Sequence, residues 1–210
     1  MKTDDLVRLL AADNAGATEN AERQSWLSGA SLTAGLAVSL MLFWAGVGLR
    51  ADIGEAFFAI VRKEAVTLAI AAAGAVALQR LSAPEGRGFF GWMAPLALAL
   101  FFVGGELASQ GSEGWQARMI GRNGLVCLTT IPALSLPLLV GLLLALRRRA
   151  PGNAALAGAA SGLAAVGIGA SLYALHCTDD STLFVAFWYS IAAVAMTVVG
   201  AVAGRQVLRW

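Results

Sequence analysis

Two cysteines are the only thiols of this 210-residue chain, and the residues around them suggest redox or metal chemistry. Cys127 lies in an apolar stretch, whereas Cys177 sits in a polar segment between His176 and the acidic pair Asp179 and Asp180. Two thiols can form a disulfide if their Cα atoms come within about 4.4–6.8 Å. Thiolates near carboxylates can instead hold a soft or borderline metal ion. Both chemistries remain open at this point.

A purely structural reading of these residues is also open. Cys127 would then be a small apolar packing residue, Cys177 an incidental loop thiol and His176 a structural side chain, since adjacent His and Cys rarely reach one metal. We nevertheless interpret the group as a responsive site. The expected sensing residues are Cys127, Cys177 and His176, and the expected ligands of a regulatory metal ion are Cys127, Cys177 and Asp179. No other cofactor is expected.

The polar N-terminal head, residues 1–25, carries a second candidate site. Thr3 can cap a short helix whose acidic first turn suits the helix dipole and whose leucines share one face. Such a short helix is marginal in water and needs a surface to order it, either the bilayer or a protein. Its acidic character favours a protein, so the predicted partner-binding residues are Asp4, Asp5, Leu6, Leu9 and Leu10.

Six apolar stretches follow the head, and they define the fold class. The chain is 58% hydrophobic and only 13% charged, and about 20 apolar helical residues suffice to cross a bilayer. We therefore predict an all-α, polytopic membrane bundle of about six spans, with boundaries near 27–49, 64–81, 89–108, 124–146, 152–175 and 182–203. The domains are a head and linker at 1–25, a membrane domain at 26–204 and a tail at 205–210.

Lysine and arginine predict the orientation, because they are retained on the cytoplasmic side. With both termini inside, the inner segments hold ten basic residues and the outer loops five, namely Arg50, Arg62, Lys63, Arg118 and Arg122. This predicts a multi-pass membrane protein with both termini in the cytoplasm and both cysteines facing outward. Glycine pairs at Gly158 and Gly162, and at Gly200 and Gly204, are typical of close helix packing in lipid.

Several functions are disfavoured by composition. A net charge of +2 is too small for direct nucleic-acid binding, and a single histidine does not suit a haem enzyme. Within the spans only Glu106 approaches the position of a transporter's ionisable group, and no hydrolase or phosphate-loop motif is present. The favoured function is a non-enzymatic membrane sensor. The alternative is a small thiol-dependent membrane enzyme or a metal-handling permease.

Four segments of the chain resemble one known family. They are the opening residues 1–6 with 11–13, the step Leu175-His176-Cys177 followed by acidic residues, the run Phe184-Val185-Ala186-Phe187-Trp188-Tyr189, and residues 204–210. These segments resemble the NrsF family of bacterial membrane anti-sigma factors. The resemblance implies a protein of the bacterial inner membrane whose cytoplasmic N-terminus sequesters an extracytoplasmic-function sigma factor. It also implies that Cys127 and Cys177 respond to heavy metals or oxidants. The sequence leaves the oligomeric state open.

Overall fold

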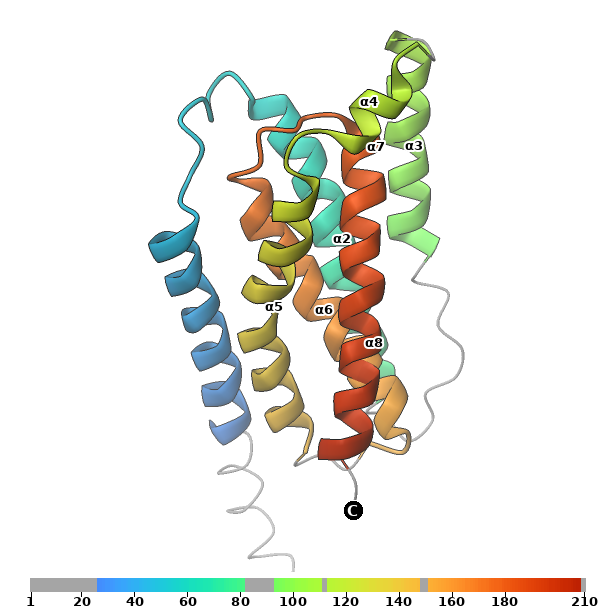
Figure 1. Ribbon diagram of the computed structural model, residues 1–210. Coiled ribbons are helices and arrows are strands. Elements are labelled where there is room, and N and C mark those ends of the chain that lie inside the picture. Colours follow the sequence, from blue (N-terminus) through green and yellow to red (C-terminus); the bar gives the residue numbers. More distant parts are fainter. Residues whose placement is uncertain (1–25, 82–92, 111–112, 148–150, 209–210) are drawn as a thin grey trace, which may run out of the picture.

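The computed structural model describes residues 26–81, 93–110, 113–147 and 151–208, and these residues form helices joined by short loops (Figure 1). The partner-binding residues predicted in the head, Asp4 to Leu10, lie outside the described residues. The helices are an unlabelled first helix Trp26–Gly46, α2 Phe57–Leu81, α3 Met93–Gln110, α4 Trp115–Ile120, α5 Gly124–Leu146, α6 Ala154–Ala174, α7 Thr182–Phe184, the π-helix η1 Val185–Tyr189, and α8 Ser190–Val207.

Each of the six predicted spans coincides with a long helix, but the count of six spans is not confirmed. Four helical segments are long and apolar enough to cross a membrane: Trp26–Gly46, Trp115–Leu146, Ala154–Ala174 and Thr182–Val207. Charged residues near both ends of α2 leave an uncharged core, Ala65–Leu78, too short to match a hydrocarbon layer about 30 Å thick. The apolar part of α3, Leu96–Gln110, is likewise short.

Helix α6 is the centre of the bundle because small residues let its neighbours approach on several faces. A methyl group added to Gly158 or Gly162 would collide with the backbone of α8, at Gly200 and Met196 respectively. A methyl group on Gly204 would lie 2.5 Å from the carbonyl oxygen of Ala154. The predicted role of these glycines in helix packing is therefore confirmed. In lipid, such close backbone approach is a main source of association energy between helices.

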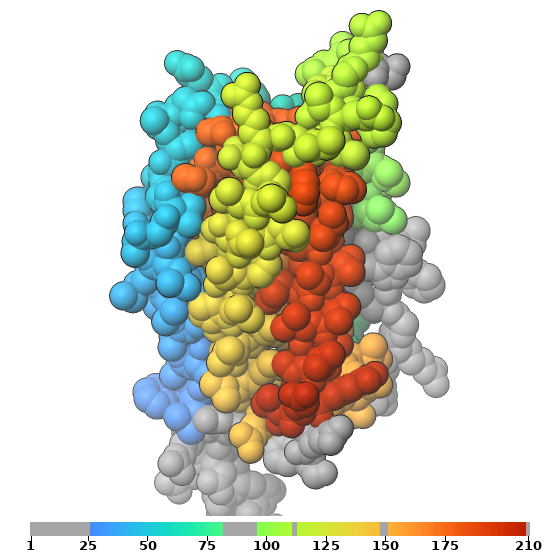
Figure 2. Space-filling view, viewed as in Figure 1, coloured from blue at the N-terminus to red at the C-terminus, as the bar shows by residue number. Residues whose placement is uncertain are grey.

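Close contacts at glycine residues also join α6 to α2 and α5, and α5 to the first helix. Gly167 faces the backbone of Ala71 in α2, and Gly169 faces Ser135 in α5. On the first helix, a methyl group at Gly35 would lie 2.7 Å from the carbonyl oxygen of Pro137 in α5. The first helix, α5 and α8 are seen side by side on the face shown in Figure 2. The bundle is thus held by backbone-to-backbone contacts that bulky side chains would prevent.

Replacing Gly162 by Ala tests this packing. The added methyl group has no room against Met196, so the overpacking cost of about 1–3 kcal/mol should lower the thermal unfolding temperature in detergent. Gly104→Ala in α3 is the matched control, because its methyl group would meet nothing within 4 Å and helix propensity favours Ala. Equal unfolding temperatures for the two variants would contradict the assignment.

Candidate functional site

At one end of the bundle, the loop between α6 and α7, residues 175–181, joins most of the helices to one another. It lies at the same end as the segment after the first helix, the start of α2 and the α4–α5 junction (Figure 1). The backbone N–H of Arg50 donates to the carbonyl oxygen of Leu175 at 3.2 Å. The other contacts of the loop involve both side chains and backbone groups of the neighbouring elements.

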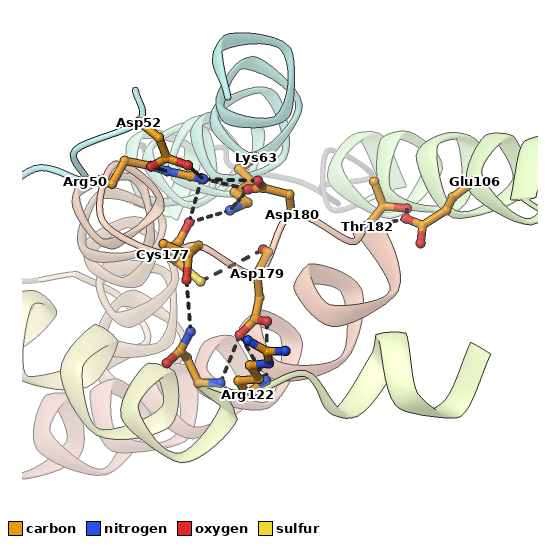
Figure 3. A network of polar contacts seen from close by, with 11 residues as sticks. Arg50, Asp52, Lys63, Glu106, Arg122, Cys177, Asp179, Asp180 and Thr182 are labelled. Carbon is orange, nitrogen blue, oxygen red and sulfur yellow. Dashed lines mark hydrogen bonds and ion pairs between the residues drawn. The ribbon is translucent and has the colours of Figure 1, made fainter. Parts of the chain in front are cut away.

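Two buried cations hold the middle of this loop (Figure 3). Arg50 and Lys63, whose side chains are only 3% and 2% exposed, both donate to the carboxylate of Asp180, at 2.8 and 2.7 Å. Both also donate to the carbonyl oxygen of Cys177, at 3.1 and 2.8 Å. We call Arg50, Lys63 and Asp180 the cation clamp. It ties the loop to the end of the first helix and to α2.

The charges of the clamp are balanced. Arg50 makes a second, bidentate pair with Asp52, at 2.8 and 2.7 Å, and this hydrogen bonding holds the pKa of Asp52 at about 2. Burial acts to raise the pKa of Asp180, but hydrogen bonds from Arg50 and Lys63 outweigh it and lower the pKa below its ordinary value. Both carboxylates are therefore ionised at neutral pH.

Asp179, next to the clamp, holds the start of α5. Its carboxylate accepts the backbone N–H groups of Arg122 and Asn123, the latter at 2.9 Å (Figure 3). A negative charge at a helix N-terminus is favourable because it faces the positive end of the helix dipole. Gly121, just before this contact, has a φ of 61°, and a Cβ there would collide with Phe184. This turn therefore requires glycine.

The far end of the loop is fastened to α3 through Glu106. Its carboxylate accepts the Ser181 hydroxyl at 2.7 Å and both the backbone N–H and the hydroxyl of Thr182 at 2.5 Å. The sequence showed Glu106 only as an ionisable residue near the end of an apolar stretch. The structure shows that it anchors the start of α7.

The structure brings the two predicted cysteines into one buried cluster beneath this loop. Cys127 is 0% and Cys177 1% exposed, and both belong to the same buried core as Tyr173. Both are free thiols. Burial raises the pKa of the Cys177 thiol, so little reactive thiolate is present at neutral pH. In this arrangement the pair is shielded from reagents in solution.

The other predicted sensing and metal residues point to different partners. The Nδ1 atom of His176 lies 3.1 Å from the carbonyl oxygen of Gly48, so the imidazole joins the loop to the end of the first helix. The Asp179 carboxylate is already occupied by backbone N–H groups. Within the described part of the chain, no three His, Cys, Asp or Glu side chains are placed to hold a metal ion.

The clamp was not foreseen from the sequence, where Arg50 and Lys63 were counted simply as loop charges. Two signals pointed to it: Lys63 adjoins an uncharged helical core, and the acidic pair Asp179–Asp180 lies in a loop expected at the same end. Tyr173 and Tyr189, which pack beside the thiols, were also missed; they are 1% and 2% exposed.

Asp180→Asn should destabilise the protein, because it leaves two buried cations without their shared counter-ion. We expect a loss of about 2–4 kcal/mol, less than for a fully buried pair because the Asp180 side chain is 35% exposed. Asp52→Asn removes the same charge from a side chain 47% exposed, and should destabilise the protein much less. Denaturant unfolding in detergent measures both, and similar losses would contradict the clamp's structural role.

Comparisons with known proteins agree with the resemblance seen in the sequence. A family model described as "Negative regulator of sigma F" matches residues 10–210. The chain is 37% identical over 216 residues to the anti-sigma-F factor NrsF of Caulobacter vibrioides, and 32% identical over 219 residues to a probable anti-sigma-F factor NrsF of Azospira oryzae, covering 100% of each chain in both cases. No solved structure matches. With residues 10–210 covered by the family model, the chain belongs to the NrsF family of negative regulators of sigma F.

Proposed function

We propose that this protein is an inner-membrane anti-sigma factor that holds an extracytoplasmic-function sigma factor at its cytoplasmic head and releases it when the outward-facing cysteines react. The family supports a sigma-factor partner. The binding surface is the acidic, leucine-bearing face of the head, with Asp4, Asp5, Leu6, Leu9 and Leu10. Both termini lie in the cytoplasm, as the distribution of basic residues favours.

The proposed sensing rests on the position of Cys177, which lies in the loop that joins the helices at one end of the bundle. Its side chain is 1% exposed, and its own carbonyl oxygen is held by Arg50 and Lys63. Any group added to this sulfur, or a bond to Cys127 that changes the spacing, needs room that the closed loop does not offer. Overfilling a packed site costs about 1–3 kcal/mol, and this cost is relieved if the loop moves.

A route from the loop to the head follows from the first helix. One end of this helix, at Trp26, directly follows the head, and its other end leads into Gly48 and Arg50, which contact the loop through His176 and Asp180. A displaced loop therefore pulls on the end of the helix whose opposite end bears the head. A tenfold loss of sigma-factor affinity needs only about 1.4 kcal/mol of difference between two arrangements.

Two chemical events would act on the same loop. Oxidation can join Cys127 to Cys177, with the two thiols as reductant and an external oxidant as electron acceptor. A thiophilic metal ion can instead bind the two thiolates, with Asp179 as a third ligand if it exchanges its N–H partners for the metal. Metal binding would in addition weaken the contact between Asp179 and the start of α5.

Changing Leu6 and Leu9 to Asp should abolish capture of the sigma factor, because the apolar face would become charged. A pull-down of the co-expressed sigma factor on the full-length, detergent-solubilised protein measures this loss, expected to exceed tenfold. Ala11→Asp, which adds a charge on the opposite side of the same predicted helix, should bind normally. Undiminished capture of the sigma factor by the Leu6 and Leu9 variant would show that this face of the head is not the binding surface.

Replacing Cys127 and Cys177 together, by Ser or by Ala, should keep the sigma factor bound during metal or oxidant stress. A transcriptional reporter of the sigma factor should then stay uninduced, while Ser39→Ala, another small buried side chain, should respond like the unaltered protein. Normal induction in both double variants would show that the thiols are packing residues and do not sense the stress.

A further inference from the structure

A cavity of about 130 Å³ lies at the end of the bundle opposite the α6–α7 loop, where the chain enters the first helix at Trp26 (Figure 1). The first helix, α2 and α5 line it, chiefly with Ser28, Leu32, Leu78, Leu142, Ala145 and Leu146. Each of these residues lies within two turns of the end of its helix, so the cavity is close to the end surface of the bundle. The function proposed above gives it no role.

The size and lining of the cavity suit one branched apolar side chain. Apart from Ser28 and the exposed Gln79, the lining consists of leucine and alanine. An apolar cavity of about 150 Å³ can hold a benzene ring, so this cavity has room for the smaller side chain of a leucine. An empty apolar cavity is unfavourable because the atoms that line it lack contacts on one side.

The polar head of the chain, residues 1–25, joins the bundle beside this cavity, because Ser28 is only two residues beyond Trp26. Fifteen residues separate Leu10 from Trp26, and fifteen residues can span up to about 50 Å. The leucine-bearing face of the head can therefore reach the cavity. Because the two are parts of one chain, the effective concentration is in the millimolar range, and even a weak contact becomes populated.

The charges of the head and of this end of the bundle are complementary. The described residues in the last two turns of the helices here contain no Asp or Glu, and they include the exposed side chains of Arg80, Arg147 and Arg205. Arg147 directly follows the lining residue Leu146. In the head, Asp4 and Asp5 directly precede Leu6. A leucine of this face in the cavity would bring carboxylates close to guanidinium groups, which favours the contact.

We propose that this cavity binds the head of the same chain when no sigma factor is bound, with one leucine of the Leu6, Leu9 and Leu10 face inside it. The identity of that face rests on the function proposed above. One face cannot contact the cavity and the sigma factor together, so docking competes with capture of the sigma factor. The small volume favours a leucine over a lipid chain, most of which would remain outside the cavity.

The cavity is connected to the sensing loop through the helices that form it. At the opposite end of the bundle, the loop contacts Arg50 after the first helix, Lys63 in α2 and Asn123 at the start of α5. The three elements that the loop holds there are the three that line the cavity. A change in their relative positions would alter the fit of the leucine and shift the competition with the sigma factor.

Photo-crosslinking of the full-length protein in lipid nanodiscs, without sigma factor, tests the docking. A benzophenone amino acid in place of Val7 leaves the three leucines intact, and mass spectrometry maps its crosslinks, which we expect in the lining segments of the first helix, α2 and α5. The same probe at Ala17 is the matched control, because it lies nearer to the cavity along the chain but outside the leucine face. Equal crosslinking from both positions, or crosslinks from Val7 to lipid alone, would overturn the docking.

Filling the cavity tests the site itself. Ala145→Leu and Leu142→Phe each add carbon atoms to its wall, and either variant that unfolds at the temperature of the unaltered protein should reduce the crosslinks from Val7 at least about tenfold. Ala37→Leu is the matched control, since residue 37 is exposed on the first helix and does not line the cavity. Undiminished crosslinking in a folded, cavity-filled variant would overturn the site.

Purified sigma factor at a saturating concentration then tests the competition. It should abolish the crosslinks from Val7 to the cavity, and the cavity-filled variants should bind the sigma factor more tightly than the unaltered protein does. Crosslinks that persist with the sigma factor bound would overturn the competition. Failure of the sigma factor to bind at all would contradict the proposed function, whereas the crosslinks measured without it report on the docking alone.

Discussion

The carboxylate of Asp180, shared between the buried side chains of Arg50 and Lys63, is the interaction on which the rest of this end of the molecule depends. Neither cation could be buried to 3% exposure or less without a counter-ion, since an unpaired charge in an apolar bundle costs several kcal/mol. The same cations also hold the carbonyl oxygen of Cys177. The position of the thiol is therefore set by electrostatics as well as by packing.

This arrangement makes the loop a junction rather than a simple connection. Within seven residues it contacts the end of the first helix, α2, α3 and the start of α5, through His176, Asp180, Ser181 and Asp179 respectively. Below it, the glycine-lined contacts of α6 leave little freedom for one helix to shift alone. In the proposed mechanism, a change at the loop is passed on as a displacement of whole helices.

Most of the fold follows from hydrophobic patterning, because apolar length and the charges between apolar stretches are visible in the sequence. The long helices and the glycine packing of α6 against α8 were predicted on this basis. Two features could not be read in this way. The pairing of Arg50 and Lys63 with Asp180 joins residues more than a hundred positions apart, and the shielding of Cys177 depends on that pairing. Basic residues near the end of an apolar stretch indicate on which side of the membrane that end lies. They do so whether their side chains face water or a buried carboxylate, so the sequence does not distinguish the two cases.

The central claim is that chemistry at the two thiols changes the affinity of the head for its sigma factor. The most direct test is the dissociation constant of the sigma factor for the full-length protein in lipid nanodiscs, measured before and after exposure to a thiol oxidant or a thiophilic metal ion. The account predicts at least a tenfold weaker complex after exposure, reversed by reductant or chelator, and no change when Cys127 and Cys177 are both Ser. An unchanged dissociation constant for the unaltered protein, with its thiols shown to have reacted, would contradict it.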